Sequence, residues 1–286
     1  MSIVVTGSTG LLGGLVIQDL LDAGVPAGEI KAVARSKEKA AGLAERGVQV
    51  VIADYDQPAS YDEVFAAGDR VLLISGSEPG RRIPQHQAVI DAATAAGVAQ
   101  LAYTGIFGGP KADFLLSADH RATEQAILDS GLPYTFLRNN WYVEMLLNDL
   151  AGAVERGAVV NGVTADARIA TATREDYAAA AAVVLRTDGH LNQAYELGGD
   201  VAWTFGEFAA EVAKQSGKPV VHTPISHDDN LALLIKVGLP EGFAQVLADV
   251  DDAISRGALA GTPGDLSRLI GRPTTPLADS IRAALA

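Results

Sequence analysis

A glycine-rich segment near the N-terminus constrains the fold of this chain more than any other feature. Its Gly-x-x-Gly-x-x-Gly spacing lies between an apolar run, Ile3 to Val5, and a helical pattern, Leu11 to Ala23. Gly7 permits a tight turn, Gly10 lets a phosphate approach the backbone, and Gly13 allows close packing of helix on strand. A strand, a glycine turn and a helix in this order predict a dinucleotide-binding unit, against the alternative of a bare structural turn. The expected contacts are Gly7, Ser8, Thr9, Gly10, Leu11 and Leu12, with the Ser8 and Thr9 hydroxyls as additional donors.

Short apolar runs alternate with helical patterns through the first half of the chain. The runs lack polar alternation, as strands covered on both faces do. The predicted strands are Ile3 to Val5, Ile30 to Ala34, Val48 to Ile52, Val71 to Ile74, Leu101 to Tyr103 and Tyr134 to Leu137. The predicted helices are Leu11 to Ala23, Lys37 to Arg46, Tyr61 to Ala67, Ile83 to Ala96 and Asp119 to Ser130. This series predicts an α/β fold, a Rossmann-type doubly wound parallel sheet.

The regular alternation of apolar runs and helical patterns ends after residue 140, which predicts a second structural unit. Residues 1–140 are expected to form the NAD(P)-binding domain, and residues 141–286 a smaller, mostly helical, discontinuous substrate-binding lobe, with segments near 166–198 returning to the sheet. Thr204 to Glu207 has the pattern of a capping box that opens a helix. Helices are expected at Met145 to Arg156 and Asp176 to Leu185, an extended segment at Arg168 to Thr173 and a strand at Ala194 to Leu197. The segments Val220 to Pro224, Asp228 to Val237, Phe243 to Arg256 and Pro276 to Ala286 are expected to complete the mostly helical lobe.

Composition narrows the possible partners. A net charge of -13 over 286 residues opposes binding to nucleic acid. Cysteine is absent, so disulfides, thiolate catalysis and Cys-based zinc sites are excluded. We expect a cytoplasmic protein without a signal peptide or membrane segment, and we leave open a homodimer. The five histidines have no metal-binding spacing, so no metal is expected, and no Gly-x-Ser-x-Gly nucleophile motif occurs.

The residue after the second predicted strand indicates which dinucleotide is bound. A carboxylate there would favour NAD, but this chain has Arg35. A guanidinium can grip the 2'-phosphate of NADPH, and Lys37 and Lys39 add positive charge. NADPH is therefore expected in preference to NADH, unless Arg35 is only a solvated residue at a helix start.

Other expected contacts follow the later strands. Asp54 and Tyr55 are expected beside the adenine, and Ser75, Gly76 and Ser77 beside the ribose and phosphates, although ordinary turns are the alternative for both segments. Tyr103 and Thr104 are expected near the nicotinamide, as is the segment after the sixth strand. That segment is Asn139, Asn140, Trp141, Tyr142, Val143 and Glu144, in which Trp141 and Tyr142 fit equally well as packing anchors.

The following helix lacks the acid relay of ordinary short-chain dehydrogenases. Where they place Tyr-x-x-x-Lys, this chain reads His120 to Glu124, with no Tyr and no Lys. An acceptor that needs no protein acid is therefore favoured, either a quinone or a cationic dye carbon. His120, Tyr103 and Asn139 are the candidate catalytic residues that orient the acceptor. His120 is also a candidate proton donor, with a structural histidine as the alternative.

These motifs together resemble the NmrA-like atypical short-chain dehydrogenases, nearly end to end. The segments that carry the resemblance are Val5 to Gly10, Ala34-Arg35, Ala53 to Tyr55, Leu73 to Gly76, Pro84 to His86, Ala102 to Thr104, Tyr134 to Asn139, Ala172 to Arg174, Gln215 to Lys218 and Leu269 to Gly271. The resemblance implies NADP binding by Gly7 to Leu12, Arg35, Ser75 to Ser77 and Asn139 to Glu144.

The same resemblance implies hydride transfer from NADPH to a quinone-like small molecule, with dyes as acceptors in some members. The loop from Gly105 to Pro110 departs from the family pattern and is expected to border the acceptor. Two alternatives stay open. One is a non-catalytic redox sensor that binds NADP(H). The other is a carbonyl, imine or dye reductase, with His120 as the acid where the acceptor is a carbonyl or an imine.

Overall fold

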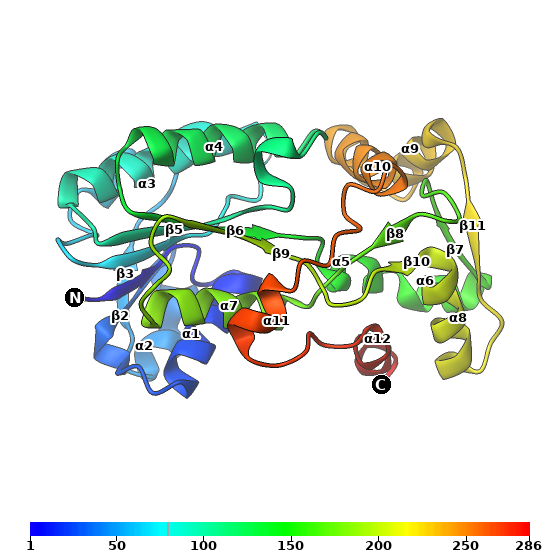
Figure 1. Ribbon diagram of the computed structural model, residues 1–286, viewed down its shortest axis with the longest axis horizontal. Helices are drawn as coiled ribbons and strands as arrows, with labels where there is room; N and C mark the ends of the chain where they lie inside the picture. Colours follow the sequence, from blue (N-terminus) through cyan, green and yellow to red (C-terminus); the bar gives the residue numbers. More distant parts are fainter. Residues whose placement is uncertain (79) are drawn as a thin grey trace.

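The computed structural model describes residues 1–78 and 80–286, and its centre is one parallel sheet (Figure 1). Seven strands pair in the order β3-β2-β1-β4-β5-β6-β9. They are β1 (Ile3–Val5), β2 (Ile30–Ala34), β3 (Gln49–Ile52), β4 (Arg70–Leu73), β5 (Gln100–Ile106), β6 (Tyr134–Asn139) and β9 (Gln193–Leu197). This order confirms the predicted Rossmann-type fold, in which ligands bind where the strand order reverses, between β1 and β4.

Helices cover both faces of the sheet, as its apolar strands require. Figure 1 shows α3 (Arg82–Ala96) and α4 (Ser117–Asp129) on one face. On the other face lie α1 (Leu11–Asp22), α2 (Lys37–Glu45) and α7 (Arg174–Arg186). The alanines of α7 are buried in the same apolar cluster as Val16, Ile17 and Leu20 of α1. Small side chains on α7 therefore allow these two helices to lie close together.

Two predicted helices are corrected by the structure. None of residues 61–67 is α-helical; a short 3-10 helix, Pro58–Tyr61, is followed by turns. The apolar spacing there reflects burial of Tyr61, Val64 and Phe65 in the core beside α3, because a segment this short gains little from helix formation. The pattern from Met145 to Arg156 forms two helices, α5 (Val143–Leu147) and α6 (Leu150–Arg156).

Strands β5 and β6 run further than the sequence patterns predicted. Their pairing continues to Ile106 and Asn139, and β6 pairs with β9 up to Leu197. The extra residues carry the chain past the sheet toward the second unit. Asn139 and its successors therefore begin at the carboxyl edge of the sheet.

The second unit has its own apolar core around Trp203, Phe205 and Phe208. The predicted capping box is present, since the Thr204 hydroxyl and the Glu207 carboxylate each accept a backbone N–H. The helices are α8 (Phe205–Ser216), α9 (His227–Lys236), α10 (Glu241–Ser255) and α12 (Leu277–Leu285). The strand pairs are β7 (Ala158–Asn161) with β11 (Val221–Pro224), and β8 (Arg168–Ile169) with β10 (Trp203–Thr204).

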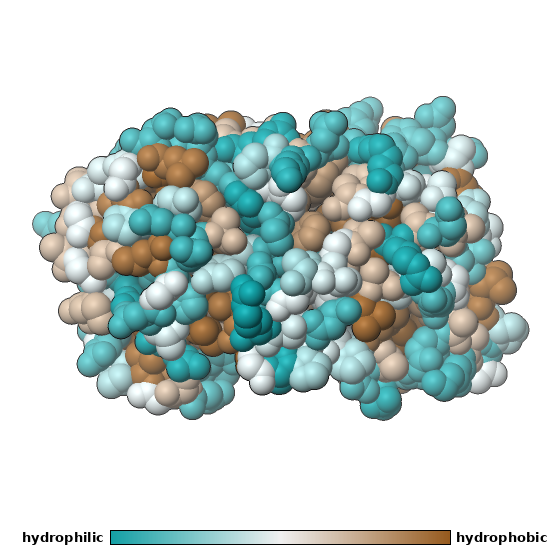
Figure 2. All heavy atoms as spheres, viewed as in Figure 1, coloured by the Kyte–Doolittle hydropathy of each residue, from teal (hydrophilic) through white to brown (hydrophobic). Residues whose placement is uncertain are grey.

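A late segment returns to the sheet. Helix α11 (Asp265–Ile270) packs on α7 and β9, although nothing in the sequence pattern predicted it. The domain boundaries stay a prediction. In the view of Figure 2, hydrophobic residues are exposed in small separate groups among hydrophilic ones, as on most globular surfaces. Within the described residues, every helix is too short or too polar to cross a membrane.

Candidate functional site

Two adjoining cavities open along the carboxyl edge of the sheet. The glycine-loop cavity, of about 340 Å³, is lined by Gly7, Thr9, Gly10, Arg35 and Tyr55 among others. The Arg82 cavity, of about 380 Å³, is lined by residues that include Leu12, Arg82, His120 and Asn139. Both share the segment from Ile74 to Ser77 after β4. The loop sites predicted from the sequence thus meet in one elongated cleft.

The glycine loop is shaped to receive a phosphate. Gly7 has φ +59°, and a Cβ at Gly10 would stand 3.1 Å from the Gly7 carbonyl oxygen. A Cβ at Gly13 would stand 2.9 Å from both the Gly7 carbonyl carbon and Ser8 Cα, so only glycine fits. Among the described residues, no side chain caps the N-terminus of α1, and its first turn carries no acid. Its free N–H groups and the helix dipole suit an anion.

Two residues of the loop do not face the cavity. The Ser8 hydroxyl is buried and donates to the Val33 carbonyl at 2.8 Å, so it is not the free donor that was expected. Leu11 is 74% exposed and does not line either cavity in the described structure. Thr9 and Leu12 do line the cleft.

The far end of the glycine-loop cavity is cationic. Arg35, Ser36 and Lys39 line it, whereas Lys37 does not. Arg35 is exposed and forms no ion pair within residues 1–78 and 80–286. Its guanidinium is therefore available to an anionic ligand at the place where the sequence predicted the 2'-phosphate.

Asp54 and Tyr55 also line this cavity, but the Tyr55 hydroxyl is engaged in hydrogen bonds within the protein. Its hydroxyl lies 2.6 Å from the Thr6 hydroxyl and donates to the Ile74 carbonyl at 2.8 Å. It therefore ties the turn after β1 to the turn after β4, the two segments between which the cleft opens. Burial raises its pKa, so the phenol stays protonated.

Three side chains form a chain of contacts in the Arg82 cavity. Arg82 Nε donates to the Gly76 carbonyl at 2.6 Å, and its Nη1 lies 3.3 Å from His120 Nε2. His120 Nδ1 lies 2.7 Å from the Tyr103 hydroxyl. Because a guanidinium only donates, His120 Nε2 accepts, and the neutral ring carries its proton on Nδ1, toward Tyr103.

This arrangement corrects two expected roles. Burial first, and then the charge of Arg82, lowers the pKa of His120 to about 3, so the ring is neutral, and both of its nitrogens already have partners in Arg82 and Tyr103. His120 is thus poorly suited to donate a proton into the cavity. Tyr103 is fully buried at 0% exposure and does not line the cavity in the described structure. Its hydroxyl contacts His120 instead of the cavity.

The segment after β6 divides between the cavity and the protein interior. Asn139, Asn140, Trp141 and Tyr142 line the Arg82 cavity. The Asn140 amide is already used, since it donates to the Leu259 carbonyl at 3.0 Å and accepts from Trp141 N–H. Asn139 Nδ2 donates to the Tyr142 hydroxyl at 3.3 Å, and Asn139 Oδ1 has no hydrogen-bond partner among the described residues.

The structure does not bring Val143 and Glu144 to either cavity of the cleft. The Val143 N–H bonds the Ala172 carbonyl at 3.0 Å, which turns α5 away from the sheet edge. Glu144 accepts from the Arg174 backbone N–H at 2.8 Å and lies 3.6 Å from the Arg174 guanidinium. Arg174, which sequence reasoning missed, lines the cavity instead.

Sequence reasoning also missed Arg82 and the apolar wall of the cavity. Phe243, Val246 and Leu247 of α10 line it from the second unit. Arg82 lies just before the Pro84 to His86 motif, and no acid follows it within a helical turn. That absence of a helical ion-pair partner was the available signal.

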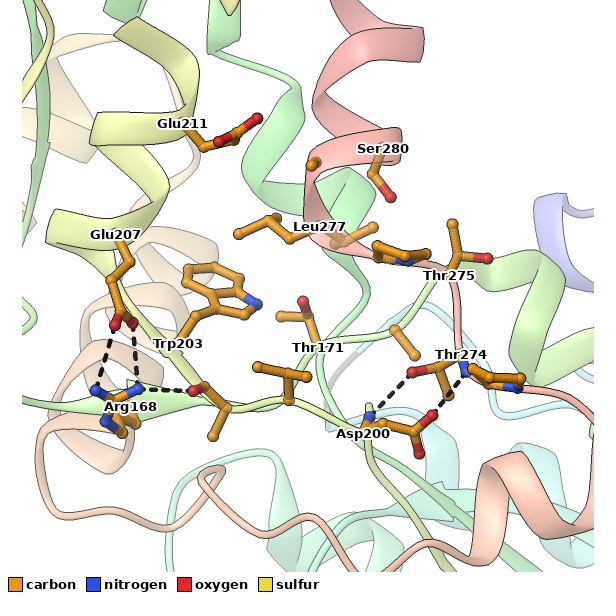
Figure 3. A pocket seen from close by; sticks show the side chains of 17 residues that line it. Arg168, Thr171, Asp200, Trp203, Glu207, Glu211, Thr274, Thr275, Leu277 and Ser280 are labelled. Atoms are coloured by element: carbon orange, nitrogen blue, oxygen red, sulfur yellow. Dashed lines mark hydrogen bonds and ion pairs between the residues drawn. The ribbon is translucent and has the colours of Figure 1, made fainter. Parts of the chain in front are cut away.

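A third hollow lies elsewhere and has different chemistry. It has a volume of about 480 Å³ and is lined from α8, α12 and the segment from Pro273 to Pro276. In Figure 3, Arg168 pairs with Glu207 on one side, and Asp200 and Thr274 exchange hydrogen bonds on the other. Of the predicted site residues that the structure describes, only Val143 lines it. Within the described chain, no three His, Asp or Glu residues cluster as metal ligands.

Comparison with known proteins agrees with this geometry. A family described as NAD(P)H-binding matches residues 7–188. Quinone oxidoreductase 2 of Escherichia coli strain K12 is 46% identical over 279 residues, which are 98% of this chain and 97% of that protein. The E. coli NADPH-dependent quinone oxidoreductase, solved with NADPH, superposes with a TM-score of 0.96 at 45% identity, covering 99% of this chain and 100% of that one.

A dye-reducing enzyme is also similar. Triphenylmethane reductase of Citrobacter sp., solved with NADP(H), gives a TM-score of 0.94 at 43% identity, over 99% of this chain and 100% of that one. Both relatives span the whole chain, so the likeness includes the second unit as well as the sheet. The chain therefore belongs to the NAD(P)H-binding, NmrA-like family of atypical short-chain dehydrogenases that its motifs resemble.

Proposed function

We propose that this protein is an NADPH-dependent oxidoreductase that reduces a quinone or a similar planar conjugated acceptor. The observation that carries the proposal is the joining of the two cavities at Ser75 to Ser77. One cavity has the phosphate-binding loop and a free cation, and the other has apolar walls and a neutral histidine. The E. coli relative, an NADPH-dependent quinone oxidoreductase, supports the same activity.

The residues present fit NADPH. The N–H groups at the start of α1 suit its diphosphate, since the glycines there leave the space that a Cβ would fill. Arg35, Lys39 and Ser36 suit the 2'-phosphate. Leu12, Ile74 and Asn139 line the Arg82 cavity, in which the nicotinamide would meet the acceptor. When bound, NADPH supplies a hydride to the acceptor.

The chain's own contribution is placement and exclusion of water. Trp141, Tyr142 and Phe243 offer flat side chains against which a planar ring can stack, and the aliphatic side chains of α10 close the same cavity. Holding two reactants together in such a cavity accounts for large rate enhancements without a protein acid. A quinone suits this site because water can protonate its reduced oxygens.

The alternatives differ in what they require. A carbonyl or imine reductase needs an acid, which the neutral His120 is poorly placed to supply. A dye reductase needs none, and the Citrobacter relative supports including dyes among the acceptors tested. A redox sensor needs only the glycine-loop cavity. A cytoplasmic location and a homodimer stay predictions.

The test is turnover with purified protein. NADPH is mixed with benzoquinones, naphthoquinones, a triphenylmethane dye and simple aldehydes, and the absorbance of the reduced nicotinamide is followed. We expect saturable oxidation of NADPH with quinones, weaker or no oxidation with aldehydes, and a higher KM for NADH. Tight NADPH binding without turnover of any acceptor would favour the sensor and contradict the proposal.

A further inference from the structure

Arg82 is a buried cation without a counter-charge. Its side chain is part of a residue only 9% exposed, at the first position of α3. Throughout the described chain, no carboxylate forms an ion pair with it, while the adjacent Arg81 pairs with both Glu78 and Asp56. Burying an unpaired charge is costly, so such groups are usually retained where a ligand supplies the missing charge.

The protein holds this cation in place instead of neutralising it. Among the described residues, its side chain has two hydrogen-bond partners, the Gly76 carbonyl at 2.6 Å and His120 Nε2 at 3.3 Å, and both are neutral acceptors. Gly76 is itself fixed, because its N–H donates to His86 Nε2 at 2.9 Å. Asp119 attracts the guanidinium but accepts from Gly80 N–H at 2.9 Å. Burial raises the pKa of Tyr103 and of Tyr142, so both phenols stay protonated, and it lowers the pKa of His86 to about 3, so that ring is neutral. Arg174, the other guanidinium that lines the cavity, lies 3.6 Å from the Glu144 carboxylate.

The position of Arg82 indicates which anion it meets. It lines the cavity walled by α10 and does not line the glycine-loop cavity in the described structure. The phosphates already have their own donors there, at the start of α1 and at Arg35. Arg82 is therefore left for an anion other than the phosphates, one that forms in the Arg82 cavity itself. The acceptor is such a group, because it acquires negative charge when it is reduced.

We propose that Arg82 binds the acceptor oxygen that becomes anionic on reduction, with His120 and Tyr103 as positioning residues for its guanidinium. The proposal rests on the proposed function. In the step concerned, a C–H bond of dihydronicotinamide breaks and its electron pair and hydrogen pass to the quinone. The nicotinamide is oxidised to NADP+, the quinone is reduced to a hydroquinone monoanion, and the remaining proton comes from water.

Such a site stabilises charge that develops during the reaction, in a place from which water is largely excluded. A donor that is already oriented costs no reorganisation when the charge appears. The planar guanidinium also favours an oxygen at the edge of a flat ring. The acceptor class that follows is a conjugated ring with a carbonyl oxygen, which includes quinones and excludes triphenylmethane dyes without oxygen.

The proposal is tested by binding, apart from turnover. The probes are 2-hydroxy-1,4-naphthoquinone, which is an anion at neutral pH, and the neutral 2-methyl-1,4-naphthoquinone, both titrated into protein saturated with NADP+. Arg82→Gln should weaken binding of the anion about ten-fold or more, as expected for a lost charge-assisted hydrogen bond, and leave the neutral ring nearly unchanged. Arg82→Lys should retain part of the effect.

Arg81→Gln is the matched control, since it removes a neighbouring arginine that pairs with acids outside the Arg82 cavity. It should bind both probes as the parent does. A second readout is the pKa of the bound hydroxynaphthoquinone, followed by its colour: the parent should lower it, and Arg82→Gln should not. Circular dichroism spectra that match the parent show that each variant is folded.

The outcomes separate this inference from the function. Equal binding of the anion by the parent and by both Arg82 variants overturns the inference, even if the parent reduces quinones. Equal losses for the anionic and the neutral probe also overturn it, because they indicate packing only. Arg82-dependent binding of the anion without quinone turnover by the parent would support the site and contradict the proposed function.

Discussion

The two ends of the cleft are built in opposite ways. The glycine-loop end takes its donors from one continuous turn and from Arg35 and Lys39, which are exposed to solvent. The Arg82 end takes Arg82 from α3, His120 from α4 and Asn139 from β6, and all three residues are buried. The first end presents exposed positive charge that suits an anionic ligand arriving from water. The second end holds the buried charge of Arg82, which has no ion-pair partner among the described residues, beside apolar walls.

Under the proposed function, this difference would separate specificity for the hydride donor from specificity for the acceptor. An exposed cation discriminates between ligands by their fixed charge, and dissolved salt weakens this attraction by screening it. A buried cation acts strongly on charge that appears within reach of it. Substitutions at the two ends should therefore change different measurements, which gives three ways to test the contrast.

The largest effect is expected at the exposed end. Arg35→Asp removes a charge-assisted bond of roughly 1.5–3 kcal/mol and adds repulsion of the 2'-phosphate, so KM for NADPH should rise about 100-fold. KM for NADH should change little. Lys37→Asp makes the same change of charge at a residue that does not line the cavity, and it serves as the control. Equal effects of Arg35→Asp on both dinucleotides would refute the assignment of the 2'-phosphate.

A smaller effect, common to both dinucleotides, is expected from the loop itself. Gly13→Ala places a Cβ 2.9 Å from the Gly7 carbonyl carbon, so the loop must shift, at a cost of roughly 1–3 kcal/mol. Titration of intrinsic fluorescence should show about ten-fold weaker binding of NADPH and NADH alike. Gly14→Ala is the matched control, because its nearest contact is an ordinary 3.8 Å to Ser8 O. Unchanged affinity in Gly13→Ala would show that the loop accommodates the methyl group.

The third effect is on folding stability, not on ligand binding, and concerns protons at the buried end. The pKa of His120 is lowered to about 3 by burial, so below about pH 6.5 the unfolded chain gains a proton that the folded protein does not. This histidine therefore makes stability fall as pH drops from about 6.5 toward 3, by up to about 1.4 kcal/mol per pH unit. His120→Asn should remove that part of the slope, as measured by urea unfolding at pH 5 and pH 7.

Asp251 acts in the opposite direction and has to be controlled. Burial raises its pKa to about 6, so its contribution grows as pH falls. The comparison is therefore made in an Asp251→Asn background, with and without His120→Asn. An NMR titration in which the His120 ring gains its proton near pH 6.5 would contradict the neutral, buried histidine.

Much of the sheet could be predicted from the sequence because its signals are local. The first six strands and most of their helices follow from apolar runs and from glycines at helix ends. The helix predicted from Tyr61 to Ala67 was wrong, because over so few residues an irregular buried segment has the same apolar spacing as a helix. Helix α11 was missed because its apolar residues make sense only against α7 and β9.

The site shows the same division. Gly7, Thr9, Gly10, Arg35 and Ser75 to Ser77 were placed correctly beside the cleft because strand order fixes where each turn lies. Val143 and Glu144 were grouped with their neighbours by proximity in sequence, although a bridge from Tyr142 to Ala172 redirects the chain there. Ser8 was expected to face the ligand, but its hydroxyl donates a hydrogen bond to the Val33 carbonyl.

By itself, the sequence determined the dinucleotide loop, the cation after the second strand and the absence of a Tyr-Lys relay, since each is a statement about neighbouring residues. Only the tertiary structure decided which side chains surround His120. It brings Arg82 against His120 across 38 residues, and His120 against Tyr103 across 17. The direction of each side chain depends on packing between α3, α4 and β5. A spacing rule carries no information about such packing, because the same residues on differently packed helices would face apart.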